Sequence, residues 1–164
     1  DLLSLGQRAQ AGDCLTGTGS ATVKEIREAY VARVVGDYRA VSGLKVAWDA
    51  GNGSLGPAMT QLTSCLPGNH ILLNEVVDGD FPAHHPDPTV PENLAQLQAA
   101  VAMHSCDLAL AFDGDGDRMI AFDETGTKLP GEATLGLLAI RAKAQGKLKG
   151  DVLVTTDQSN LGLD

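Results

Sequence analysis

The sequence predicts an α/β fold: a three-layer α/β/α domain with a mostly parallel mixed sheet, followed by the start of a similar domain. Apolar runs of strand length alternate with segments of helical periodicity along the chain, a pattern that favours parallel strands joined by right-handed crossovers. A glycine-rich turn and an acidic loop each follow a predicted strand, where ligands gather in open α/β sheets. The 164 residues leave room for one domain and part of another.

The first residues predict little regular structure. Residues 1–20 contain several glycines and no clear periodicity, so we expect a linker from a missing preceding domain. Thr22 and Glu25 have the spacing of a capping box, and apolar residues then repeat at helical spacing to Val35. This pattern predicts a helix from about residue 23 to residue 35.

A strand, a turn and a helix are expected next, over residues 44–48, 49–54 and 57–66. Backbone amides at the start of a helix can bind phosphate, so the glycine-rich turn is a candidate phosphate loop. It lacks the Gly-Lys-Ser/Thr ending of a nucleotide-binding loop and is not a Gly-x-Gly-x-x-Gly motif. Tight turns between a strand and a helix need glycine in any case, and this structural role is the favoured interpretation.

Residues 70–77 predict a second strand, and residues 78–88 predict a stiff loop that contains three of the seven prolines. His84 and His85 are neighbours in this loop. Adjacent side chains of an extended segment point to opposite sides, so a rigid connector is favoured over a shared metal site.

The second half of the chain predicts a further helix, two strands and a last helix. Thr89 and Glu92 form a second capping box, and a helix with a buried apolar face should follow to Met103; that face is Leu94, Leu97 and Val101. The remaining expected elements are a strand at 106–112, an antiparallel edge strand at 119–122, a turn at 123–126, a helix at 132–145 and a strand at 152–156. We expect residues 21–127 to form one domain and residues 128–164 to open the next.

Three aspartates form the most informative feature of the chain. Asp113, Asp115 and Asp117 follow the apolar run 108–112 and are separated by single glycines. Glycine allows the backbone to curl tightly, which brings the three carboxylates together, and like charges at such distances favour a bound cation. A set of carboxylate oxygens without cysteine or histidine suits Mg²⁺. The sequence therefore predicts a magnesium site.

A calcium loop is the alternative interpretation of the same residues. The three aspartates match positions one, three and five of an EF-hand loop, and Glu124 matches position twelve. Arg118 occupies the position that requires glycine, and the preceding segment has a strand pattern rather than a helix pattern. Both features disfavour this alternative.

Arg118 adds a phosphate-binding group to the acidic loop. Its planar guanidinium suits phosphate oxygens, and a carboxylate-held Mg²⁺ beside an arginine is a common arrangement in phosphoryl transfer. The simpler alternative is that Arg118 only balances the charge of the nearby aspartates.

Composition excludes several classes of function. A formal net charge of −9 disfavours binding to nucleic acid or to an anionic membrane surface. No apolar run has membrane-spanning length, and the chain starts without a signal peptide or a methionine. Cys14, Cys65 and Cys106 are odd in number and widely spaced, which favours reduced thiols and a cytoplasmic protein. We expect a fragment of a longer chain.

The acidic loop and three other segments resemble the α-D-phosphohexomutases, the phosphomannomutase/phosphoglucomutase family. The sequence DGDGDR at 113–118 is similar to the metal-binding loop of that family, and the segments 44–53, 78–88 and 89–94 are similar to its second domain in the same order. The resemblance implies a cytoplasmic four-domain enzyme. It would interconvert hexose 1-phosphates and hexose 6-phosphates through a phosphoserine and a bisphosphate intermediate.

The resemblance also implies roles for individual residues. Asp113, Asp115 and Asp117 would hold Mg²⁺ together with an oxygen of the phosphoserine. Arg118 would be catalytic and would bind the phosphorylated hexose. The family's Ser-His-Asn-Pro motif is absent from these 164 residues, so we expect this chain alone to be inactive.

The substrate branch is left open by the sequence. Residues 81–88 are more similar to phosphomannomutase/phosphoglucomutase, which we favour, and residues 159–163 are more similar to phosphoglucosamine mutase. A non-catalytic module that binds magnesium or calcium is the remaining alternative.

Overall fold

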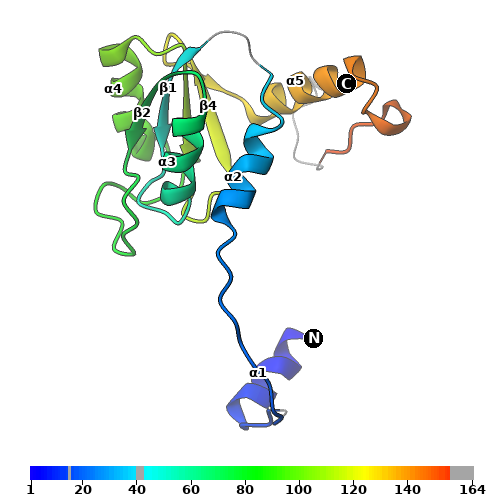
Figure 1. Ribbon diagram of the computed structural model, residues 1–164. Helices are drawn as coiled ribbons and strands as arrows, with labels where there is room; N and C mark the ends of the chain where they lie inside the picture. Colours follow the sequence, from blue (N-terminus) through cyan, green and yellow to red (C-terminus); the bar gives the residue numbers. More distant parts are fainter. Residues whose placement is uncertain (15, 40–42, 156–164) are drawn as a thin grey trace.

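The computed structural model describes residues 1–14, 16–39 and 43–155. A five-stranded mixed sheet has the order β2-β1-β3-β4-β5 (Figure 1). The strands are β1 (Leu44–Asp49), β2 (Gly68–Leu73), β3 (Leu108–Phe112), β4 (Met119–Asp123) and β5 (Lys128–Leu129). Strands β2, β1 and β3 run parallel, and β4 and β5 are antiparallel to their neighbours. The predicted α/β fold is confirmed.

Helices cover both faces of this sheet. Helix α4 lies on one side, and α3 and α2 lie on the other (Figure 1). The five α-helices among the described residues are α1 (Leu2–Gln10), α2 (Arg27–Val35), α3 (Gly56–Cys65), α4 (Ala95–His104) and α5 (Gly131–Ala144). Two 3₁₀ turns, Pro91–Leu94 and Lys149–Asp151, complete the elements.

The core lies between α4 and the sheet. Small side chains on the strands let the helix approach closely, and Phe122 fills the space between them without any exposure. The cluster consists of Ala47, Leu94, Leu97, Ala100, Val101, Cys106, Ala109, Ala111 and Phe122. The predicted buried face of this helix, Leu94, Leu97 and Val101, is therefore confirmed.

Two stacked aromatic rings lie on the opposite face of the sheet. The rings of Trp48 and Phe112 stack at a centroid distance of 6.3 Å, and the Trp48 indole N–H donates to His70 Nδ1 at 3.1 Å. Tyr30 from α2 and Met59 from α3 line a cavity of about 140 Å³ above the two rings. Helices α2 and α3 thus complete the third layer.

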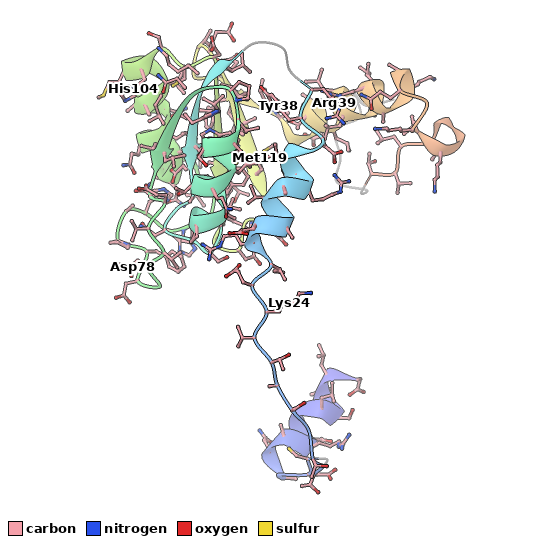
Figure 2. The ribbon with its side chains drawn as sticks, viewed as in Figure 1. Lys24, Tyr38, Arg39, Asp78, His104 and Met119 are labelled. Atoms are coloured by element: carbon pink, nitrogen blue, oxygen red, sulfur yellow. The ribbon has the colours of Figure 1, made fainter. Side chains whose placement is uncertain are left out.

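The N-terminal prediction needs two corrections. Residues 2–10 form helix α1, capped by Asp1, where we expected little regular structure, and none of its residues is buried. Helix α2 begins at Arg27, so the capping box at Thr22 and Glu25 does not form; Glu25 instead accepts a hydrogen bond from the Arg27 backbone N–H at 2.8 Å. The residues before α2 are extended, and Lys24 projects from them (Figure 2).

The second capping box is also wrong. Thr89 donates its hydroxyl to Asp87 at 2.7 Å. The N-cap of the 3₁₀ turn Pro91–Leu94 is Val90, and no side chain caps this turn. Because the Thr89 hydroxyl is bonded inside its own turn, it does not serve the helix.

Strand boundaries account for the remaining differences. Strand β2 ends at Leu73, so residues 74–77 are not in the sheet, and β4 is not an edge because the unpredicted strand β5 pairs with it. Residues 152–155 form no strand, and residue 156 lies outside the described residues. The last helix, by contrast, lies within one residue of its predicted bounds.

Candidate metal centre

The acidic loop is a tight connection between β3 and β4. Phe112 pairs with Met119, and Asp113 N–H donates to the Arg118 carbonyl at 3.3 Å, which closes the loop at its base. Inside it, Gly116 has a φ of 77° and donates its N–H to the Asp113 carbonyl at 3.1 Å. This left-handed conformation explains why glycine occupies the position.

The loop gathers its three carboxylates into one group, as predicted. Ligand oxygens of Asp113, Asp115 and Asp117 all lie within 4.8 Å of one another. Asp113 is buried and the other two are exposed. Three hard oxygen donors with an open side suit Mg²⁺, which prefers oxygen ligands and usually keeps several waters.

Electrostatics in the loop favours a cation. The negative charge of Asp115, followed by that of Asp113, raises the pKa of the Asp117 carboxyl, because like charges disfavour ionisation. Burial by itself would raise the pKa of Asp113, but the hydrogen bonds from the Arg118 backbone and guanidinium together bring that pKa below its usual value. Asp113 is thus kept ionised, while Asp117 carries the unrelieved repulsion.

Arg118 is held by two carboxylates. Its Nε donates to Asp113 Oδ2 at 2.7 Å, and its backbone N–H donates to Asp113 Oδ1 at 3.1 Å. Its Nη1 lies 3.6 Å from Asp87 Oδ1. The hydrogen bond to Asp113 is the main cause that raises the pKa of Arg118, and the side chain remains 55% exposed. The guanidinium therefore balances the aspartates and is still accessible to a ligand.

The glycine-rich turn supports this loop and is not a phosphate loop. Its amides are used inside the protein: Asn52 N–H donates to the Asn74 carbonyl at 2.8 Å, and Ser54 N–H donates to the Gly114 carbonyl at 2.9 Å. A Cβ added at Gly53 would lie 2.5 Å from the Gly114 carbonyl oxygen. The favoured structural role of residues 49–54 is consistent with these contacts.

A buried network behind the metal loop was missed by the sequence reasoning. His84 Nε2 lies 2.9 Å from Asp49 Oδ2, and Asn74 and the Gly51 N–H donate to Asp49 Oδ1 at 2.9 Å. Asp49 is 1% exposed, and buried carboxylates need such partners. The sequence held one signal for this network: Asp49 is an acidic residue at the end of the apolar segment that forms β1.

The calcium-loop alternative is excluded by the strand register. Glu124 follows Asp123, which pairs with Leu108 at the opposite end of β3 from the aspartates. Met119 and Asp123 are four residue steps apart along β4, roughly 13 Å, so Glu124 cannot reach the same ion. A calcium loop also needs glycine at the position of Arg118, and it needs a helix where this chain has strand β3.

Two further expectations concern the whole chain. Cys14, Cys65 and Cys106 carry free thiols, and burial raises the pKa of Cys106. Within the described part of the chain, no helix has the length and hydrophobicity needed to cross a bilayer.

Comparisons with known proteins point to one family. The family domain described as "Phosphoglucomutase/phosphomannomutase, alpha/beta/alpha domain II" matches residues 28–126. A phosphomannomutase/phosphoglucomutase of Pseudomonas aeruginosa PAO1 is 40% identical over 136 residues, which cover 83% of this chain and 29% of that protein. A phosphoglucosamine mutase of Symbiobacterium thermophilum is 39% identical over 140 residues, or 85% of this chain and 31% of that protein.

A solved structure has the same fold. The crystal structure of a phosphoglucomutase/phosphomannomutase family protein from Burkholderia thailandensis is 35% identical, with a TM-score of 0.81 over 88% of this chain and 31% of that one. The chain thus spans about a third of the length of these relatives. Since the domain match covers more than half of its residues, this chain belongs to the phosphoglucomutase/phosphomannomutase family.

Proposed function

We propose that this chain is the metal-binding part of a phosphohexomutase that interconverts hexose 1-phosphates and hexose 6-phosphates through a phosphoserine and a bisphosphate intermediate. The observation that carries the proposal is the convergence of three aspartates within 4.8 Å, with Arg118 bonded to one of them. A structural cation would need the carboxylates alone. An exposed guanidinium beside them suits a phosphoryl group.

Each residue has a distinct role in this proposal. Asp113, Asp115 and Asp117 would hold Mg²⁺, which supplies charge neutralisation at the phosphoryl oxygens when bound. Asp113 also fixes the guanidinium of Arg118 through the bond to Nε. Arg118 would bind and orient the phosphoryl group of the hexose substrate and stabilise its charge during transfer. The phosphoserine would come from residues outside this sequence, since its motif is absent here.

The domain and substrate assignments extend the proposal. We place the family's second domain at residues 21–127, with a linker before it and the opening of a following domain at 128–164; the match over 28–126 supports the central assignment. Strand β5 continues the sheet to Leu129, two residues past that boundary. The free thiols support a cytoplasmic enzyme.

Phosphoglucosamine mutase is the second candidate activity. A relative with that name has 39% identity, against 40% for a phosphomannomutase/phosphoglucomutase. Rates of the longer enzyme that contains this chain, measured on mannose 1-phosphate and glucosamine 1-phosphate, separate the two. We expect faster turnover of the mannose compound, and a preference for the amino sugar would overturn this choice. This chain alone should turn over neither.

Metal binding tests the central claim. Calorimetric titration with Mg²⁺ should show binding to this chain, and Asp115→Asn should weaken it by about tenfold or more, because it removes one of three ligand charges. Glu124→Gln is the matched control: it removes one negative charge from the exposed far end of β4 and should leave the affinity unchanged. A wild-type chain that binds no Mg²⁺ would refute the proposal.

A further inference from the structure

The loop at residues 78–88 covers the metal loop. Its Pro86 is buried, and a Cβ added at Gly114 would lie 3.4 Å from Pro86 Cγ and 3.8 Å from the ring of Phe81. The two loops are separated by about 30 residues of sequence but are in contact beside the aspartates. Residues 78–88 therefore form one wall of the candidate site.

This wall is fixed at two points, one on the turn that follows β1 and one on the last residue of β1. Asp78 N–H donates to the Asn52 carbonyl at 2.9 Å. Further along, His84 bonds to the buried Asp49 at 2.9 Å, and its other ring nitrogen lies 3.0 Å from the His85 carbonyl. Both ring nitrogens face oxygen atoms, so the ring position is determined from two sides. The loop is therefore anchored by groups that do not belong to the metal loop.

The anchored wall ends in a carboxylate aimed at Arg118. Asp87 Oδ1 accepts from the backbone N–H of Thr89 at 3.0 Å and from its hydroxyl at 2.7 Å. The hydroxyl bond is the main cause that lowers the pKa of Asp87. The same oxygen lies 3.6 Å from Arg118 Nη1, and the Asp87 side chain is only 28% exposed.

Two carboxylates at different nitrogens define the plane of a guanidinium. A bond at Nε alone leaves the far end of Arg118 free to swing, because the side chain is 55% exposed. Asp87 supplies the second point, at Nη1. Among the described residues, Nη2 has no hydrogen-bond or ion-pair partner, so this nitrogen is available to an anionic ligand.

We propose that Asp87 is a positioning residue that, from a wall anchored by the His84–Asp49 pair, orients Arg118 so that it presents Nη2 to a phosphoryl oxygen beside the metal. The inference rests on the proposed function, since it assumes that a phosphoryl group binds there. Orientation of a charged donor before the ligand arrives strengthens binding, because less freedom is lost when the contact forms.

Asp87→Asn tests the role of the charge without disturbing the turn. Asparagine keeps the Oδ1 acceptor that both Thr89 donors need, and it removes the negative charge that attracts Arg118. Asp78→Asn is the matched control. Asp78 lies in the same loop (Figure 2) and accepts a hydrogen bond from the Asp80 N–H at 2.9 Å, but no hydrogen bond or ion pair joins it to Arg118.

The probe is inorganic phosphate, titrated into the whole chain in the presence of saturating Mg²⁺ and followed by amide chemical shifts of residues 113–118. Asp87→Asn should weaken phosphate binding by about tenfold, as expected for a charge-assisted contact that loses its orientation. Its Mg²⁺ affinity and melting temperature should match those of Asp78→Asn, which a merely structural role for Asp87 would not allow.

The possible outcomes distinguish the positioning role of Asp87 from the proposed function. If the wild-type chain binds Mg²⁺ and phosphate and Asp87→Asn binds phosphate equally well, the positioning role is wrong and the proposed function stands. The role is also wrong if Asp87→Asn loses Mg²⁺ affinity or stability to the same extent, or if the Mg²⁺-loaded wild type binds no phosphate. A wild-type chain that fails to bind Mg²⁺ overturns the proposed function and this inference with it.

Discussion

Gly53→Ala should distort the metal loop from a position outside it. A Cβ at residue 53 would lie 2.5 Å from the Gly114 carbonyl oxygen and 2.9 Å from its carbonyl carbon. These are backbone atoms, so no side-chain rotation relieves the contact. Gly114 stands between two proposed metal ligands, Asp113 and Asp115, and it also accepts the hydrogen bond from Ser54.

The size of the effect follows from the contact distance. To restore an ordinary contact of at least 3.4 Å from 2.5 Å, the Gly114 carbonyl must move by roughly 0.9 Å or more. Overpacking of this kind costs about 1–3 kcal/mol of unfolding free energy. The same movement separates the ligand oxygens, and we expect Mg²⁺ affinity to fall by about tenfold, since displacements near 1 Å have large effects on preorganised sites.

Two measurements on two variants check this expectation. Urea unfolding gives the change in stability, and calorimetry gives the Mg²⁺ affinity. Gly79→Ala is the matched control, because a Cβ at residue 79 would meet no atom within 4 Å; it should leave both quantities close to their wild-type values. Wild-type stability and Mg²⁺ affinity in Gly53→Ala would show that the turn and the metal loop do not support each other as described.

Two further perturbations test the electrostatics. The charges of Asp115 and Asp113 raise the pKa of Asp117. Repulsion among the three carboxylates therefore destabilises the folded chain above that pKa, and it is relieved as the pH falls through it. Mg²⁺ binding needs the ionised carboxylates, so the affinity of the chain for Mg²⁺ should decline from pH 7 toward pH 4.5. Calorimetry at the two pH values measures this, and a constant affinity would contradict the coupling. His84→Ala removes a partner of the 1%-exposed Asp49 and should lower the unfolding free energy by about 3 kcal/mol. The matched control is His85→Ala at an exposed position, which should change the unfolding free energy by less than about 0.5 kcal/mol in denaturant unfolding. Equal losses of stability in the two variants would show that the buried His84–Asp49 pair is unimportant.

Local patterns in the sequence were sufficient where one segment determines its own structure. The apolar run before the aspartates predicts β3, and the Asp-Gly repeat predicts a curled loop because aspartate and glycine disfavour strands. The three carboxylates then meet within 4.8 Å. The direction of the next strand followed as well: a short apolar segment directly after a tight loop is expected to return antiparallel, as β4 does, although β4 is not the edge strand that the sequence predicted.

Local patterns failed where another residue, often a nearer one, competes for the same polar group. Thr89 fits a capping box with Glu92, but its hydroxyl bonds to Asp87, and Glu25 bonds to Arg27. The spacing of a capping box indicates that two residues can bond at the start of a helix, but it does not exclude a hydrogen bond to a nearer residue. The Asp49–His84 pair spans 35 residues, and no local pattern links two residues that meet only after the sheet has formed.

The position of β1 in the sheet explains why the site forms at all. Strand β1 lies between β2 and β3, and all three are parallel. The segments that follow these strands therefore all start at the carboxyl ends of the strands, on one side of the sheet. Backbone hydrogen bonds connect these segments to one another: Asn52 N–H donates to the Asn74 carbonyl, and Ser54 N–H donates to the Gly114 carbonyl. Three carboxylates would separate if only their own loop held them, since each repels the others. The backbone bonds from Ser54 and the pairing of Phe112 with Met119 oppose that separation. The fold therefore maintains a repulsive arrangement that a divalent cation would relieve, and part of the proposed affinity for Mg²⁺ would come from the sheet rather than from the aspartates themselves.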